Sequence, residues 1–314
     1  MSVFKGKILL ATDGSSEAER AAGTAVKLSE RLGSELHVTY VEPMPDPLAW
    51  PESRFIAPEL RGDIRERAEN EARAKLQDEA EKIRGMGGKI TEVHARAGRP
   101  DAEIVRAAEE LDAGLVILGS RGLGPVRRAV MGSVSGSVVH HSHGSVLIVR
   151  DGGGEDGSLS GPVLLAVDGS RQAQVATEAA VEISSATGSG LHVVFVMPTA
   201  EHLYGHHLYS EEVKRSVREQ AESDVEAFLD ERRGWIEAHG GKVEDTQVAV
   251  GRPDAEIVRL AEELQAGLIV VGSRGLGGVR RALMGSVSDS VVRHAHGPVL
   301  VARGNEGSET GEAQ

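Results

Sequence analysis

An internal repeat is the feature that most constrains the fold of this chain. Gly119-Ser-Arg-Gly122 is followed after nine residues by Gly132-Ser133, and the same pattern recurs from Gly272 with its second part at Gly285-Ser286. The offset of 153 residues, from 119 to 272, matches a whole domain rather than a solenoid repeat of about 20–50 residues. A chain of 314 residues is therefore expected to fold as two similar domains.

Composition marks where these domains begin and end. A stretch rich in Gly, Ser and Asp over 151–161 predicts a flexible linker, and the polar segment 304–314 predicts a disordered tail. The sequence thus predicts one domain over 1–150 and another over 162–303.

Charge and residue usage exclude several classes of protein. The formal net charge of −13 argues against nucleic acid and anionic membrane surfaces as partners, because these need a basic face. The absence of cysteine excludes disulfides, thiolate catalysis and Cys-ligated zinc. The first residues lack the apolar stretch of a signal peptide, and no segment has the roughly 20 apolar residues of a membrane span. We therefore expect a cytoplasmic protein.

Short apolar runs alternate with amphipathic segments in both copies. The runs predict five strands in each, near 8–11, 36–41, 89–95, 115–118 and 146–149, and near 163–166, 191–196, 242–250, 268–271 and 299–302. The predicted helices include two long charged ones, at 58–85 and 210–238. Alternation of this kind is typical of an α/β fold with a parallel sheet and helices on both faces. Ligands bind such sheets beyond the carboxyl ends of the strands, where the strand order reverses.

The repeated glycine motif follows the fourth strand, at that end of the sheet. Gly119 and Gly122 suit a turn that needs positive φ or close approach of a ligand. Gly132-Ser133 precedes a short helix whose free N–H groups predict an anion site, with Ser133 and Ser135 as further donors. The motif is neither a P-loop, which needs Gly-Lys-Ser/Thr, nor a dinucleotide fingerprint. The alternative is that the glycines serve only a tight turn.

With an aspartate after the first strand, this pattern resembles the ATP-binding branch of the universal stress protein family, in a tandem two-domain form. The resemblance implies a strand order of 3-2-1-4-5 in each domain and one ATP site per domain. It also implies that the aspartate and a residue of the second strand contact the nucleoside, that the first glycine pair lies near the ribose and phosphates, and that the helix start contacts the phosphates. Arg121 and Arg274 lie inside the glycine turns, which favours a ligand or cross-domain role for them. The site residues are Ala11, Asp13, Val41, Gly119, Arg121, Gly122, Gly132, Ser133, Val134 and Ser135, and Ala166, Asp168, Val196, Gly272, Arg274, Gly275, Gly285, Ser286, Val287 and Ser288.

Three functions remain open at this point. The first is an ATP-binding stress-response or signalling module that acts on an unknown protein partner. The second is a slow ATPase that uses Mg²⁺ or Mn²⁺ bound through the phosphates, although each site offers only one clear carboxylate and no lysine. The third is a scaffold with vestigial sites. The resemblance also implies pairing of the last strands, 146–149 and 299–302, as a pseudo-dimer within the chain, and a further homodimer.

Other conspicuous residues receive plainer interpretations. The arginine pairs 127–128 and 280–281 lie between the glycines, where they could contact phosphates or a partner, or belong to a solvated flap. The Pro-rich segment 42–58 could cover the nucleotide or form a contact surface, but we expect a variable surface loop. Histidines gather at 140–143, 294–296 and 202–207, but we expect helix caps and surface positions rather than a metal site.

Overall fold

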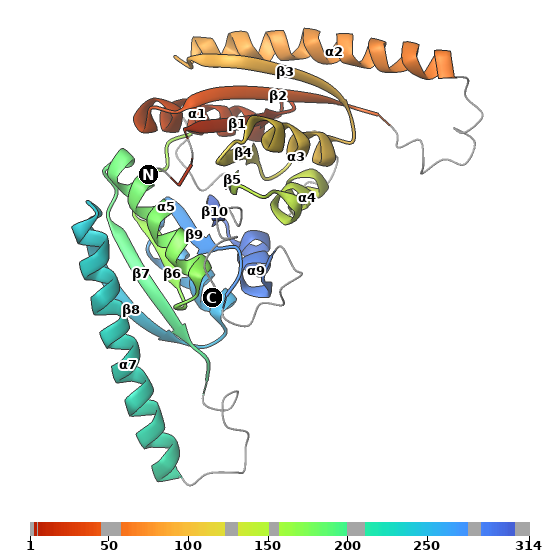
Figure 1. Cartoon of the computed structure of the whole chain (residues 1–314). Helices are drawn as coiled ribbons and strands as arrows, with labels where there is room; N and C mark the ends of the chain where they lie inside the picture. Colours follow the sequence, from red (N-terminus) through yellow and green to blue (C-terminus); the bar gives the residue numbers. More distant parts are fainter. Residues whose placement is uncertain are drawn as a thin grey trace, which may run out of the picture. The chain divides into compact units, whose positions relative to one another are not determined.

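The computed structural model describes residues 3–4, 6–44, 58–122, 131–150, 157–199, 211–275 and 284–304, with the side chains of 58–61, 211–214 and 217 left out of the description. These residues form two compact units, of which the first runs to Ser158 and the second spans Leu159–Gly304 (Figure 1). No helix among the described residues is long and apolar enough to cross a membrane.

Unit 1 is a parallel sheet covered by helices on both faces. Its strands lie in the order β3-β2-β1-β4-β5, as the family resemblance implied. Helices α1 and α2 pack on one face, and α3 and α4 on the other (Figure 1). The elements are β1 (Lys7–Thr12), α1 (Ser16–Leu32), β2 (Glu35–Pro43), α2 (Pro58–Gly85), β3 (Ile90–Gly98), α3 (Pro100–Leu111), β4 (Leu115–Gly119), α4 (Ser133–His141) and β5 (Ser145–Val149).

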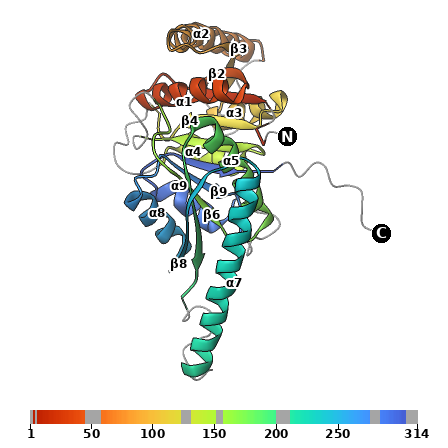
Figure 2. The same cartoon turned by 90° about the vertical axis from the view of Figure 1, so that its left-hand side faces the viewer.

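Unit 2 repeats this topology. The equivalent order is β8-β7-β6-β9-β10, and all strand pairs within it are parallel. Helices α5 and α7 cover one face and α8 and α9 the other (Figure 2). The elements are β6 (Val163–Val167), α5 (Arg171–Thr187), β7 (Leu191–Met197), α7 (Glu211–Ala238), β8 (Val243–Val250), α8 (Pro253–Glu263), β9 (Leu268–Gly272), α9 (Ser286–His294) and β10 (Val299–Ala302).

The first helix of each unit is capped at both ends by its own sequence. Ser15 accepts a hydrogen bond from the Ala18 N–H at the start of α1, and Ser170 accepts one from Ala173 at the start of α5. Gly33 and Gly188 end these helices with φ of 63° and 76°. Glycine suits these C-caps because the left-handed conformation costs it no Cβ clash.

The core is aliphatic, as a chain with 3 % aromatic residues requires. The central strands β1 and β4 are buried on both faces, so their sequences read as continuous apolar runs instead of alternating ones. Burial of this kind supplies most of the free energy of folding. It also fixes the carboxyl ends of β1 and β4 side by side.

The segment Gly-Arg-Pro-Asp-Ala-Glu-Ile-Val-Arg, found verbatim in both halves, starts α3 and α8. In unit 2, Asp254 accepts hydrogen bonds from Arg252 at 2.7 Å and from the Ser290 hydroxyl of α9 at 2.6 Å. The pKa of Asp254 is lowered to about 2, chiefly by the Arg252 hydrogen bond. This aspartate therefore ties the start of α8 to α9, next to the glycine motif.

Candidate functional site

Asp13 and the glycine motif meet at one place in unit 1, although they lie more than 100 residues apart in the chain. Strands β1 and β4 are neighbours, with Ala11 beside Leu118. A Cβ on Gly122 would overlap Asp13 Oδ2, so the absence of a side chain lets the carboxylate lie there. Asp168 and Gly275 stand in the same relation in unit 2. Each unit thus brings its aspartate and glycine turn together.

The aspartates are held in place by the turn that follows them. The N–H of Ser15 donates to Asp13 Oδ1 at 3.0 Å, and the N–H of Ser170 donates to Asp168 Oδ1 at 2.9 Å. One carboxylate oxygen is therefore engaged by the backbone. The other faces the glycine turn.

The expectation of positive φ at the glycine motif was wrong. The positive-φ glycines of this region are Gly14 and Gly169, at 77° and 80°, and neither Gly119 nor Gly122 is among them. Gly119 is needed for packing, because its Cβ would lie 2.9 Å from the backbone carbon of Glu17 in α1. Its role is to let the strand end approach the helix.

The second half of the motif starts a helix whose N–H groups have no side-chain cap. Gly132 and Gly285 are the N-cap residues of α4 and α9, with no side-chain hydrogen bond at either start. This contrasts with the serine caps of α1 and α5. Uncapped N–H groups at the positive end of a helix dipole favour a bound anion.

The two serines of each helix start behave differently. Ser133 and Ser286 are exposed. Ser135 and Ser288 are buried, and their hydroxyls donate to the carbonyls of Ser120 at 2.7 Å and Gly272 at 2.6 Å. These two hydroxyls tie the helix start to the end of the preceding strand, and contact of Ser135 and Ser288 with an anion stays a prediction.

In unit 2 these residues line a cavity of about 670 Å³. This volume lies within the roughly 300–1,000 Å³ of small-molecule sites. All ten residues expected in this half line it: Ala166, Asp168, Val196, Gly272, Arg274, Gly275, Gly285, Ser286, Val287 and Ser288. Pro253, Ile257 and Met284 also form part of its wall, but they were not predicted because they carry no polar signal.

The equivalent positions of unit 1 come from the same elements. Ala11 and Val41 are buried near the ends of β1 and β2, and Gly132, Ser133 and Val134 begin α4. Arg121, however, forms an ion pair with Glu17 at 2.6 Å, and the Ser120 hydroxyl donates to the same carboxylate at 3.1 Å. Unit 1 therefore places a buried negative charge beside its glycine motif.

Unit 2 has a more positive electrostatic environment. Gln172 precedes Ala173 in α5, as Glu17 precedes Ala18 in α1. Unit 2 therefore has an amide where unit 1 has the Glu17 carboxylate. Burial lowers the pKa of Arg303 to about 10, and the charge of Arg274 lowers it further in the same direction. In unit 1 burial and Arg121 lower the pKa of Arg150, but Glu17 acts against them.

The histidines noticed in the sequence lie at helix ends. His141 and His294 lie within 2.8 Å of the carbonyls of Ser137 and Ser290. Exposed His143 and His296 pair with Glu109 and Glu262. These are cap and surface positions, as expected.

A different group, His37, Glu92 and His94, is the one set among the described residues that could hold a metal ion. This group was not predicted, although Glu35-Leu-His37 and Glu92-Val-His94 repeat one Glu-x-His pattern on two predicted strands. Burial lowers the pKa of His94.

Some expected features lie outside the described residues. These are the arginine pairs 127–128 and 280–281, the histidines 202, 206 and 207, most of the segment 42–58, linker residues 151–156 and tail residues 305–314.

Comparisons with known proteins agree with this architecture. The sequence model of the universal stress protein family matches residues 6–150 and 160–303. A universal stress protein of Mycolicibacterium smegmatis is 29 % identical over 303 residues, covering 94 % of this chain and 96 % of that protein. One from Mycobacterium tuberculosis is 28 % identical, covering 94 % of each chain. The crystal structure of a universal stress protein from Archaeoglobus fulgidus superposes with a TM-score of 0.69 at 28 % identity, covering 95 % of this chain and 98 % of that one. With both of its units matched, the chain belongs to the universal stress protein family.

Proposed function

We propose that this protein binds ATP, with one site in each domain, and acts as a nucleotide-dependent module of a stress response. The cavity of unit 2 carries the proposal. It joins an apolar wall, a carboxylate, an arginine and a helix N-terminus without a side-chain cap. This combination fits a ligand with one apolar ring system, one polar sugar and several negative charges.

The chemistry of the walls gives each part of the nucleotide a place. The start of α9 at Gly285, Ser286 and Val287, together with Arg274, would receive the phosphates. Asp168 would accept hydrogen bonds from the ribose, and Val196 would contact the adenine ring. In unit 1 the corresponding roles fall to Gly132, Ser133, Val134, Arg121, Asp13 and Val41.

Binding without fast turnover is the better-supported activity. Asp168 is the only carboxylate among the described residues that line the cavity, and no histidine or lysine lines it beside Asp168. A base that activates water needs a free acceptor aimed at the reacting phosphate. Mg²⁺ or Mn²⁺ would arrive bound to the phosphates and neutralise part of their charge.

Two measurements test the proposal. Mass spectrometry of nucleotide released from the purified full chain should detect ATP, and calorimetry of the stripped protein should give about two equivalents. Gly285→Ala should reduce the nucleotide bound, because its Cβ would stand 3.3 Å from the Arg274 Cα. Failure to bind any nucleotide would favour the scaffold with vestigial sites.

A single-turnover assay with Mg²⁺ or Mn²⁺ addresses hydrolysis. We expect no more product from the wild type than from an Asp13→Ala/Asp168→Ala double variant. Product formed by the wild type alone would instead support a slow ATPase.

The pairing of the last strands and a homodimer remain predictions from the sequence.

A further inference from the structure

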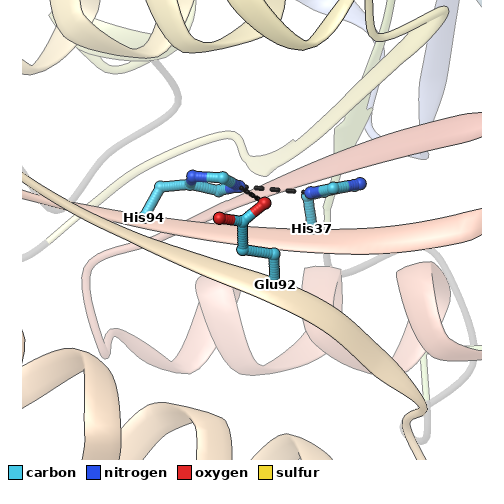
Figure 3. Close-up of side chains that lie close together, drawn as sticks. All are labelled: His37, Glu92 and His94. Atoms are coloured by element: carbon cyan, nitrogen blue, oxygen red, sulfur yellow. Dashed lines mark hydrogen bonds and ion pairs between the residues drawn. The ribbon is translucent and has the colours of Figure 1, made fainter.

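Two Glu-x-His pairs lie on neighbouring strands of unit 1, away from the nucleotide site. Glu35 and His37 are on β2, and Glu92 and His94 are on β3, where His37 pairs with Glu92 (Figure 3). Residues two apart on a strand share a face of the sheet. His37 precedes Val41 by four residues, roughly 13 Å along the strand, so this group lies toward the opposite end of the sheet from the nucleotide site.

Three potential ligand atoms converge in this group. His37 Nδ1 lies 3.1 Å from His94 Nε2, and His94 Nε2 lies 3.9 Å from Glu92 Oε2 (Figure 3). A nitrogen from each ring and one Glu92 oxygen all lie within 4.8 Å of one another. Ligands bound tetrahedrally at about 2.0–2.1 Å are about 3.4 Å apart. Small side-chain movements would therefore place all three around one ion.

The remaining nitrogen of His37 has a partner that suits metal binding. His37 Nε2 lies 3.3 Å from Glu35 Oε2, so a proton on Nε2 is held by that carboxylate. The lone pair is then on Nδ1, which faces His94. A carboxylate that fixes the tautomer of a ligating histidine in this way is a recurrent feature of metal sites.

The local backbone and burial also suit an ion. A shift in register between Leu36 and His37 marks a β-bulge on β3 at this point, and bulges redirect side chains. The His37 side chain is 5 % exposed and that of His94 is 15 % exposed, whereas Glu92 is 64 % exposed. An ion could enter at the edge strand and keep water as a further ligand.

The second domain shows that the fold does not require this group. It retains the bulge and a histidine, His192, paired with Asp245 as His37 is with Glu92. Gln247, two residues after Asp245, takes the position that His94 has in unit 1. Gly190, two residues before His192, takes the position of Glu35. The paired histidines are therefore a property of unit 1 alone.

We propose that His37 Nδ1, His94 Nε2 and the Glu92 carboxylate of unit 1 bind one Zn²⁺ ion, with Glu35 orienting His37. Two imidazoles and a carboxylate suit zinc, which then keeps an open position for water. The ion would connect β2 to the edge strand β3. The site is independent of the nucleotide proposal, since it shares no residue with the nucleotide site.

Zinc titration of the untagged, nucleotide-free full chain against a chromophoric chelator tests the site. The wild type should bind one equivalent of zinc. Its zinc affinity should exceed that of His94→Gln by at least about 100-fold, because losing a ligand costs more affinity than losing an orienting group. His94→Gln copies Gln247 of the second domain and should therefore fold. Glu35→Gln should weaken binding by about 10-fold.

His192→Gln is the matched control, because it removes a histidine from the same strand position of the other domain. It should bind zinc as the wild type does. Thermal melting in EDTA should show each variant folded, and added zinc should raise the melting temperature only where the site is intact. Equal zinc affinity in the wild type and His94→Gln, or no zinc bound by the wild type, would overturn the proposal.

Discussion

Oδ2 of Asp13 lies in the space that a Cβ on Gly122 would occupy, and Oδ2 of Asp168 stands in the same relation to Gly275. The aspartate comes from the turn after the first strand of its unit and the glycine from the turn after the fourth. Each glycine is therefore needed for the position of a carboxylate that lies far from it in the sequence.

The first prediction concerns Gly275→Ala. The added methyl group would displace the Asp168 carboxylate from the turn, and overpacking of this kind costs about 1–3 kcal/mol. We expect ATP affinity in unit 2 to fall at least about tenfold, measured by calorimetry. Gly234→Ala is the control, since nothing lies within 4 Å of a Cβ there, and an equal loss in both variants would contradict the explanation.

The second prediction concerns the charge beside the two sites. Glu17→Gln removes a carboxylate that pairs with Arg121, whereas Gln172→Glu adds one to unit 2. A unit charge about 10 Å from a phosphate at an effective dielectric constant of about 20 is worth about 1–2 kcal/mol. ATP affinity should rise about tenfold in unit 1 and fall about tenfold in unit 2, in calorimetry that resolves two sites. No change in either direction would show that the charge asymmetry does not control binding.

The third prediction concerns pH and Asp254. Its folded pKa of about 2 lies below the ordinary value of 3.8, so its contribution to stability is complete above pH 4–5 and is lost as the pH falls toward 2. Asp254→Asn should lower the free energy of unfolding by about 1–2 kcal/mol at pH 7, allowing for the exposed Arg252 partner. Denaturant unfolding at several pH values should show this difference vanish near pH 2. A difference that stays constant with pH would contradict the assignment.

The fourth prediction concerns the end of α1. Gly33 has a φ of 63° and nothing lies within 4 Å of a Cβ there, so Gly33→Ala should carry only the backbone cost of the left-handed conformation. That cost is about 1–2 kcal/mol. Gly62→Ala, in the second turn of α2, should leave stability unchanged or raise it. Thermal unfolding of the two variants compares them directly, and equal melting temperatures would exclude the capping role.

Most of the fold could be predicted because its signals are local. Continuous apolar runs marked the buried strands, and the first helices end at Gly33 and Gly188, a residue type that favours helix ends. The long helix expected over 58–85 has those bounds in the structure. Strand order came from the family resemblance, since hydrophobic periodicity does not specify which parallel strands are neighbours.

The candidate site could be predicted only in outline. The sequence indicated which residues follow strand ends and start helices, because glycine, serine and aspartate have strong positional preferences. It could not show that Ser135 donates to the Ser120 carbonyl or that Glu17 pairs with Arg121. Those contacts depend on the distance between a strand end and a helix that is fixed by packing across the whole core.

The sequence by itself determined that this protein has two α/β domains, each with a glycine-rich turn suited to phosphate. Only the tertiary structure decided which residues of each copy come together. His37 and His94 are separated by more than 50 residues. Strand pairing with a bulge brings His37 Nδ1 to 3.1 Å from His94 Nε2. The physical reason is that local preference sets the conformation of a segment, whereas the register between segments is set by burial of the sheet as a whole.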